Sequence, residues 1–371
     1  MRLRQRIEEE IRRRGPIPFS RYMEMCLYDP ELGYYAAHAQ QFGKAGDFYT
    51  SSDVHAVFGR LLARQFNEIW LALGSPSVLR MVELGPGRGL FAQDVLDWSE
   101  KKFVDFFQAV SYALVEASPA LRGRLEETLQ RHIETGRATI LEKLPAEPTT
   151  PAIIFANEFF DALPVEVVSH RGELRVGCEQ GRFTEGFVPT SVAALDYLDR
   201  YSVHPEAGER VEAALAAQEY MRNLAERLGC GFVIALDYGY TRDEQLAGRH
   251  RGTVTAVRRH TISASPYEAP GEQDITAHVN FTALQSAARD GGLEPLALLT
   301  QAQFLMGIGE ANQFADAFEE TRLPQEQAKV ALQLKHLVTP AGMGESFHVL
   351  VMSKGVDAGS ARLLSGLKFA R

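Results

Sequence analysis

One short segment, MVELGPGRGL (81–90), limits the possible folds more than any other part of the chain. An apolar run ending in residues 82–84 passes straight into a turn that contains Gly85, Gly87 and Gly89, and a helical pattern follows at once. Glycine allows positive φ angles and close approach of a ligand to the main chain, and a helix N-terminus adds unpaired N–H groups. This order predicts a ligand-binding turn at the carboxyl edge of an α/β sheet; a plain strand-to-helix loop is the alternative.

Apolar runs alternate with helical patterns through much of the chain. A long amphipathic helix is expected at 52–74, and further helices at about 89, from Pro119 and around 281–290. Such alternation predicts a doubly wound, mostly parallel α/β sheet of the Rossmann-like type. The expected strands are the apolar runs at 79–84, 111–117, 138–141, 152–156, 231–239, 293–299 and 347–353.

Two regions interrupt this alternation and suggest four segments. Residues 1–75 are expected to form an N-terminal helical segment, and residues 76–164 the first part of the core. Residues 165–230 are predicted to be an inserted α+β subdomain for a substrate or partner, with polar-alternating strands and then a helix at about 207–228. Residues 231–371 complete the core, with a loop insertion near 240–277 over the strand ends.

Charge and cysteine usage exclude several classes of protein. The net charge of −9 does not favour binding to nucleic acid or anionic lipid. No apolar run reaches 18 residues, so no membrane span is expected. Cys26, Cys178 and Cys230 are too widely spaced for a metal site and odd in number. We therefore expect no metal and a cytoplasmic location.

A second acidic residue supports a nucleotide-like ligand. Glu116 ends the next apolar run, where a carboxylate can accept hydrogen bonds from both ribose hydroxyls, in NAD enzymes and in S-adenosylmethionine (SAM) enzymes alike. The turn reads G-x-G-x-G, unlike the dinucleotide pattern G-x-G-x-x-G, and it resembles the motif of class I SAM-dependent methyltransferases. The resemblance implies SAM as the cofactor. The implied cofactor-binding residues are Glu83, Gly85, Pro86, Gly87, Gly89 and Glu116.

Polar residues follow the fourth apolar run, in NEFFDALPVE (157–166). Asn157, Glu158 and Asp161 interrupt apolar sequence, where an unpaired polar group is costly, and they can accept hydrogen bonds from a nitrogen nucleophile. Carboxylates also suit a cationic acceptor. A pair formed by Glu158 and Glu166 around a guanidinium is a second possibility, and a turn residue or exposed acid is the structural alternative.

NEFFDALPVE, together with GYYAAHAQQFGKAGDFYTSSDVHAVFGRLLARQ (33–65), resembles the MidA-like family of bacterial and mitochondrial SAM-dependent methyltransferases. The resemblance continues in LDYGY, PGEQDITAHVNF, TQAQFLMGIG and TPAGMGESFHVL, and so spans nearly the whole chain. It implies protein arginine methylation, with a respiratory complex I subunit as the partner and a role in complex I assembly. The family has a histidine where this chain has Glu166, which favours Asn157, Glu158 and Asp161 as the catalytic residues.

The resemblance also implies that the N-terminal segment folds over the cofactor. Phe48, Tyr49 and Thr50 are then expected near SAM, and a simple helix-starting turn is the alternative. Three further residues, from the end of the fifth strand and from TAHVNF, are candidates for substrate contacts, with loop anchoring or helix capping as alternatives: Asp237, Tyr238 and His278.

Other functions remain open on the residues alone. They are methylation of a small molecule or of a different side chain, a non-catalytic assembly factor that binds SAM, and an NAD(P) oxidoreductase. The glycine spacing and the lack of a second nucleotide motif count against the oxidoreductase.

Overall fold

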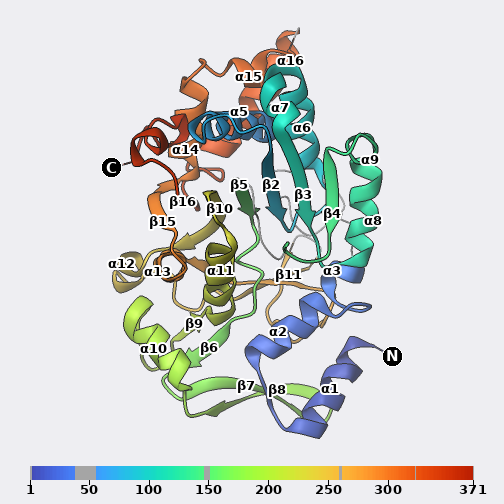
Figure 1. The fold of residues 1–371 in the computed structure, drawn as a ribbon. Coiled ribbons are helices and arrows are strands. Elements are labelled where there is room, and N and C mark those ends of the chain that lie inside the picture. The colour runs from blue at the N-terminus through green and yellow to red at the C-terminus, as the bar shows by residue number, and fades with distance from the viewer. Residues whose placement is uncertain (1, 38–55, 146–150, 259–260, 322, 371) are drawn as a thin grey trace.

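The computed structural model describes residues 2–37, 56–145, 151–258, 261–321 and 323–370. Its centre is an eight-stranded sheet in the order β15-β16-β10-β5-β2-β3-β4, with β14 beside β10 (Figure 1). The five strands from β10 to β4 are parallel, and β16 runs antiparallel between β10 and β15. The strands are β2 (Leu79–Leu84), β3 (Val110–Val115), β4 (Ala138–Leu141), β5 (Ala152–Asn157), β10 (Gly231–Tyr240), β14 (Val279–Asn280), β15 (Glu294–Thr300) and β16 (Phe347–Lys354).

Alternate residues of the strands bury opposite faces of this sheet. In β2, Met81 packs into one apolar cluster and Val82 into another, as expected for strands covered on both sides. The mostly parallel, doubly wound sheet predicted from the sequence is confirmed. The first cluster is covered by α5 (Ala56–Ala72), α6 (Leu90–Lys102), α7 (Val104–Ala109), α14 (Gln301–Glu310) and α16 (Pro324–Val338); the second is covered by α11 (Leu215–Arg227) and α13 (Phe281–Asp290).

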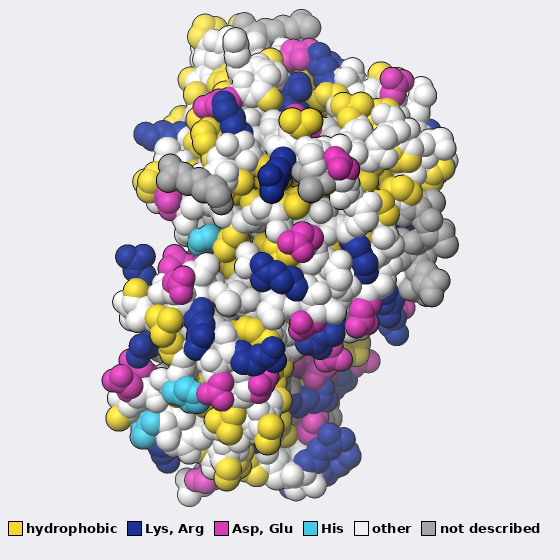
Figure 2. Space-filling view, turned by 60° about the vertical axis from the view of Figure 1, so that its left-hand side comes forward, with side chains coloured by type: hydrophobic (Ala, Val, Ile, Leu, Met, Phe, Trp, Pro, Cys, Tyr) yellow, Lys and Arg dark blue, Asp and Glu magenta, His cyan; other side chains and the backbone are white. Residues whose placement is uncertain are grey.

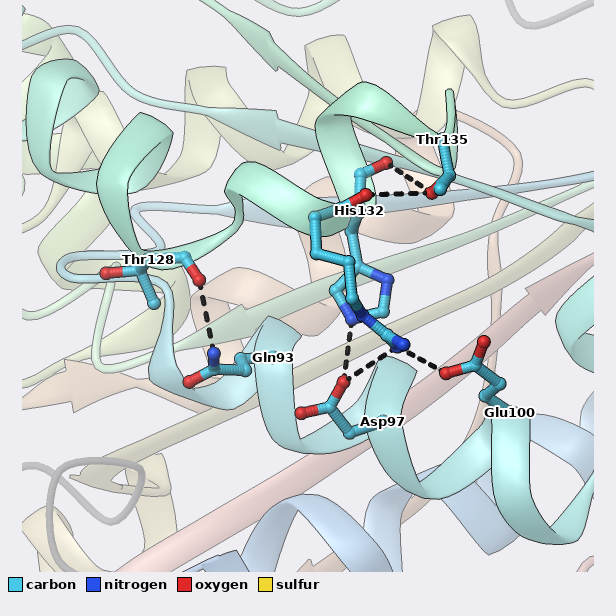
Figure 3. A network of polar contacts seen from close by, with 7 residues as sticks. Gln93, Asp97, Glu100, Thr128, His132 and Thr135 are labelled. Carbon is cyan, nitrogen blue, oxygen red and sulfur yellow. Dashed lines mark hydrogen bonds and ion pairs between the residues drawn. The ribbon is translucent and has the colours of Figure 1, made fainter.

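Polar contacts fasten α6 to α8 (Pro119–Thr128) and α9 (Gln130–Glu134) (Figure 3). The Gln93 side-chain amide donates to the carbonyl oxygen of Thr128 at 3.1 Å. The buried His132 ring lies with Nε2 2.8 Å from Asp97 Oδ1. These contacts hold the helix that begins at the glycine turn against the helices that follow β3.

A second layer lies at the end of the molecule opposite α15 and α16 (Figure 1). It is a five-stranded sheet in the order β1-β7-β6-β9, with β8 on β7, so a strand of the N-terminal segment joins strands of the predicted insert. The division of the chain into four segments stays a prediction. The elements of this layer are α1 (Leu3–Arg14), β1 (Ile17–Pro18), α2 (Phe19–Tyr28), β6 (Glu166–Ser169), β7 (Gly172–Glu179), β8 (Arg182–Val188), α10 (Val192–Tyr201) and β9 (Arg210–Ala213).

The helix predicted at 207–228 is wrong in its first part. Residues 210–213 form β9, which pairs with β6, and the helix begins at Leu215. Val211 and Ala213 enter an apolar cluster, while the buried Glu212 between them bonds the backbone of Thr253. Tertiary pairing therefore overrides the local helical pattern at this point.

The predicted loop at 240–277 contains regular structure. It holds α12 (Arg242–Leu246) and a small sheet in which β11 (Thr255–Arg258) lies between β12 (Thr261–Ile262) and β13 (Asp274–Thr276). The remaining short elements are α3 (Tyr34–Ala37), α15 (Ala315–Phe318), α17 (Ala358–Ala361) and a 3₁₀ turn at Ser365–Leu367.

The surface carries both signs of charge. Lysine and arginine side chains alternate with aspartate and glutamate over the face drawn in Figure 2. Among the helices of the described residues, none combines the length and the apolar content that a membrane span needs.

Candidate active site

A cavity of about 580 Å³ lies at the carboxyl ends of β2, β3 and β5. This volume is in the range of small-molecule and cofactor sites. Eight of the predicted site residues share its wall: Glu83, Gly85, Pro86, Gly87, Glu116, Asn157, Glu158 and Asp161. The predicted residues that do not line it are Gly89, Glu166, Asp237, Tyr238 and His278. Phe48, Tyr49 and Thr50 lie outside the described residues.

All three glycines of the turn adopt positive φ angles, of 59° at Gly85, 53° at Gly87 and 79° at Gly89. A Cβ atom at Gly87 would meet no described atom within 4 Å, so this face of the turn is open to a ligand. A Cβ atom at Gly89 would lie 2.8 Å from the Leu125 side chain. Gly87 therefore serves close approach of a ligand, and Gly89 serves close packing of α6 on α8.

Glu83 ends β2 at the cavity wall. The buried Tyr112 hydroxyl donates a hydrogen bond to Glu83 Oε2 at 2.8 Å. Burial raises the pKa of the Glu83 carboxyl to about 8, against the opposing effect of the Tyr112 bond. A cationic ligand beside Glu83 would favour its charged form. Near neutral pH the charge of this carboxyl would therefore depend on whether such a ligand is bound.

Glu116 follows β3 on the same wall. The backbone N–H of Ser118 donates to Glu116 Oε1 at 2.8 Å, and burial raises the pKa of this carboxyl to about 7. Its position beyond the second strand of the parallel core suits hydrogen bonds from ribose hydroxyls.

The end of β5 and the loop after it bring acceptors without partners among the described residues to the cavity. Asn157 Oδ1 and Asp161 Oδ1 are buried and have no hydrogen-bond partner within the described part of the chain. The Asn157 amide donates to Glu158 Oε1 at 3.2 Å, which turns the Asn157 oxygen away from that carboxylate. Burial raises the pKa of Asp161 to about 6, while a hydrogen bond from Tyr238 lowers it. Because buried acceptors without partners are costly, these oxygens are suited to a ligand that donates hydrogen bonds.

Asp237 and Tyr238 do not line the cavity, but they contact residues that do. Asp237 is fully buried, and its Oδ2 accepts hydrogen bonds from the backbone N–H groups of residues 159, 160 and 161. Burial raises the pKa of Asp237 well above its usual value, with the carboxylates of Asp161 and Glu158 adding to it and the amides opposing it. The Tyr238 hydroxyl bonds the Asp161 side chain.

Glu166 and His278 lie in other surroundings. Glu166 is on β6 and accepts a hydrogen bond from the Ser20 hydroxyl, and burial raises its pKa. His278 Nδ1 lies 3.1 Å from His250 Nδ1, and burial lowers the His278 pKa to about 4. The structure thus does not bring Glu166 together with Glu158 at the cavity.

Several wall residues were not identified from the sequence. Tyr28 and Tyr35 come from the N-terminal helices; the Tyr28 hydroxyl donates to the Ala162 carbonyl at 3.0 Å, and the Tyr35 hydroxyl to Asp274 Oδ1 at 3.3 Å. Asp274 and Thr276 come from β13. Tyr35 and Asp274 stand in the quoted segments GYYAAH and GEQDITAHVNF, but nothing local shows that these segments meet.

Taken together, the fold and the cavity define the class of protein. The protein is a class I SAM-dependent methyltransferase. It has the doubly wound sheet of that class, a three-glycine turn after the first core strand and an acid after the second. The described residues contain no group of three or more His, Cys, Asp or Glu side chains placed to hold a metal ion.

Comparison with known proteins identifies the family. Residues 61–298 match the model of a family of S-adenosyl-L-methionine-dependent methyltransferases, and the chain belongs to it. It is 31% identical to the mitochondrial protein arginine methyltransferase NDUFAF7 homolog of Drosophila melanogaster, over 96% of this chain and 86% of that protein. It is also 31% identical to NDUFAF7 of Danio rerio, over 90% of this chain and 82% of that protein.

A solved structure has the same fold. A Burkholderia thailandensis protein bound to S-adenosyl-homocysteine is 30% identical to this chain, with a TM-score of 0.85. The match covers 99% of this chain and 95% of that chain.

The cofactor of this enzyme is SAM, and the cavity fits it. The open face of Gly87 leaves room for a ligand against the main chain, and the Glu116 carboxylate is placed for ribose hydroxyls. Glu83 supplies an acid beside the glycine turn that suits a cationic group. Gly87, Glu116 and Glu83 are the residues that would hold SAM in this cavity.

Proposed function

We propose that this enzyme transfers the methyl group of SAM to an arginine side chain of a partner protein. The observation that carries the proposal is a pair of buried acceptors, Asn157 Oδ1 and Asp161 Oδ1, which find no partner among the described residues and lie beside the Glu158 carboxylate. A guanidinium presents five N–H donors in a plane and a positive charge, and so matches an amide oxygen and two carboxylates.

When bound, SAM supplies a methyl carbon that is open to in-line displacement. Asn157 and Asp161 accept hydrogen bonds from the guanidinium and orient one nitrogen toward that carbon, and orientation is a large part of such catalysis. With SAM bound, the transfer would form a nitrogen–carbon bond, break the carbon–sulfur bond and release S-adenosyl-homocysteine. The nitrogen must also lose a proton, and the Glu158 carboxylate at the cavity wall would accept it.

The names of the relatives support a protein acceptor, since those of Drosophila and Danio are protein arginine methyltransferases. By the resemblance to the MidA-like family, the partner we propose is a respiratory complex I subunit. The five-stranded sheet β1-β7-β6-β9, with β8 on β7, is the surface that we propose for docking such a partner. Cys26, Cys178 and Cys230 are free thiols, which accords with the cytoplasmic location that we propose.

The test is label transfer from radioactive SAM to an extract of cells that lack the gene, with purified enzyme added. We expect a labelled protein band and, by mass spectrometry, a methylated arginine that is absent from the deletion strain. Label in a small molecule, or on a different side chain, would overturn the arginine proposal.

Glu158→Ala tests the role of the acceptor loop. Removing the carboxylate should lower label transfer by about 100-fold or more, in the range typical of a lost general base, while S-adenosyl-homocysteine binding stays near wild type. Calorimetric titration measures that binding. Glu126→Ala, an exposed acid on α8, is the matched control and should transfer label normally. Unchanged transfer by Glu158→Ala would remove Glu158 from the mechanism.

A further inference from the structure

The backbone after β5 is held by consecutive hydrogen bonds to the end of β10. These strands are parallel, and Asn157 lies opposite Leu236. The Glu158 N–H donates to the Leu236 carbonyl at 2.9 Å, the last contact of the ladder. The next three N–H groups, of residues 159, 160 and 161, converge on Asp237 Oδ2 at 3.2, 3.0 and 3.3 Å.

The Asp237 carboxylate is itself fixed. Its Oδ1 accepts the N–H of Tyr238 at 3.0 Å, and its side chain has no exposed surface. The next side chain along, Tyr238, bonds Asp161 and Thr276 through its hydroxyl. Residues 236–238 therefore hold both the backbone of the loop and one of its carboxylates.

This arrangement maintains an unfavourable backbone conformation. Glu158 has a φ of +50°, in the left-handed region that side-chain-bearing residues seldom adopt. Such a conformation persists only where its surroundings determine it. Here it turns the chain toward Asp237 near the end of β10, and Glu158 and Asp161 line the cavity together with Asn157.

We propose that Asp237 is a positioning residue for methyl transfer. It touches neither cofactor nor acceptor; it gathers three backbone amides and so fixes the acceptor loop in the conformation in which Glu158 and Asp161 face the same ligand. This inference rests on the proposed acceptor role of that loop.

Asp237→Asn is the discriminating variant. Asparagine has one oxygen, so it cannot accept both the three loop amides and the N–H of Tyr238, and its own amide would point at a donor. The side chain is otherwise the same size, which separates the effect from a change in packing.

Glu212 provides a matched control. It is also buried, and its carboxylate accepts the N–H groups of Thr253 and Val254 at 2.9 and 3.3 Å and the Thr253 hydroxyl at 3.0 Å. It does not line the cavity. Glu212→Gln therefore removes an equivalent buried carboxylate that holds a different loop.

The experiment measures amide hydrogen exchange of residues 158–161, the affinity for S-adenosyl-homocysteine, and kcat for label transfer to the deletion-strain extract. In the wild type, these amides should exchange as slowly as those of β10. In Asp237→Asn we expect exchange about tenfold faster or more, kcat about 100-fold lower, and affinity for S-adenosyl-homocysteine within about twofold of wild type. Glu212→Gln should leave the exchange of residues 158–161, and kcat per folded molecule, at wild-type values.

Several results would overturn the inference. One is rapid wild-type exchange at residues 159–161, which can be measured even if the variant does not fold. Another is faster exchange in Asp237→Asn with an unchanged kcat, because the carboxylate would then be only structural. A wild-type enzyme that labels no acceptor would instead overturn the proposed function, and the exchange result would still decide whether Asp237 holds the loop.

Discussion

At the scale of single residues, the cavity wall contains two kinds of residue: a turn glycine that leaves space for a ligand, and buried acids that can carry charge. The turn glycines all have positive φ angles, yet a Cβ atom at Gly87 would meet no described atom within 4 Å, whereas one at Gly89 would lie 2.8 Å from the Leu125 side chain. Glu83, Glu116 and Asp161 are all buried carboxyls with raised pKa values. Burial without a full set of partners is costly, which is typical of groups that serve a ligand.

Gly87→Val should abolish cofactor binding without disrupting the core. The Cβ of the new side chain would meet no described atom within 4 Å and would project from the cavity wall, so the side chain would occupy space that the ligand needs. We expect the affinity for S-adenosyl-homocysteine to fall by about 100-fold or more, or about 2.7 kcal/mol, measured by calorimetry. Gly136→Val is the control, since Gly136 has a φ of +72°, equally open surroundings and a place outside the cavity wall. Normal binding by a folded Gly87→Val would place the cofactor elsewhere.

Glu83→Gln should reduce the dependence of stability on pH. Glu83 binds its proton more tightly in the folded protein, with a pKa of about 8 against 4.5 ordinarily, so its contribution to stability is present at low pH and is lost as pH rises through about 8. The slope for one such proton is about 1.4 kcal/mol per pH unit. Urea unfolding of the ligand-free protein between pH 5 and 8.5 measures it. The variant should show the shallower slope, the exposed control Glu126→Gln the wild-type slope, and equal slopes in all three would contradict the prediction.

At the scale of helices and strands, local patterns locate elements well where burial is continuous. The predicted strand at 138–141 and helix at 281–290 coincide with β4 and α13. The pattern does not give strand direction, and the last two apolar runs form the antiparallel pair β15 and β16. It also misses β9, because four residues have no decisive period and their pairing with β6 is a long-range contact.

Gly59→Ala tests how closely α5 and α6 approach. In an isolated helix the change is favourable by about 1 kcal/mol. Here the new Cβ would lie 2.5 Å from the Asp94 Cβ, so the helices must separate, and we expect a net loss of about 1–3 kcal/mol in the free energy of unfolding. Gly123→Ala on α8 meets nothing within 4 Å and should gain about 0.5–1 kcal/mol. Urea midpoints measure both, and a stabilised Gly59→Ala would show that the interface is looser than described.

At the scale of the whole molecule, the cavity joins parts of the chain that are distant in sequence. Tyr28 and Tyr35 reach it from the N-terminal helices, the glycine turn and Glu116 from the central sheet, and Asp274 from β13. Residues on strand ends of the core could be predicted, because the carboxyl ends of parallel strands meet at one edge. Tyr28, Tyr35 and Asp274 could not, since their convergence depends on how the N-terminal helices and β13 pack against the core. The hydrogen bonds of Asp237 could not be predicted from the sequence either, because they join β10 to a loop that is 76 to 78 residues away in the chain.

Because the N-terminal helices, the central sheet and β13 all contribute to the cavity wall, a bound ligand should stabilise all three together. Binding adds stability according to RT ln(1 + [L]/Kd), about 2.7 kcal/mol at a ligand concentration 100 times Kd. In hydrogen exchange with saturating S-adenosyl-homocysteine, we expect slower exchange in peptides covering residues 28–35, 83–90 and 272–276. Peptides of α16, which covers the opposite end of the core and contributes nothing to the wall, are the internal control and should show the smallest change. Protection confined to 83–90 would mean that the N-terminal helices and β13 enclose the acceptor and not the cofactor. Protection that extends to Tyr28, Tyr35 and β13 would mean that the cofactor links the N-terminal helices and β13 to the core, so that an acceptor would meet a completed site only after SAM has bound.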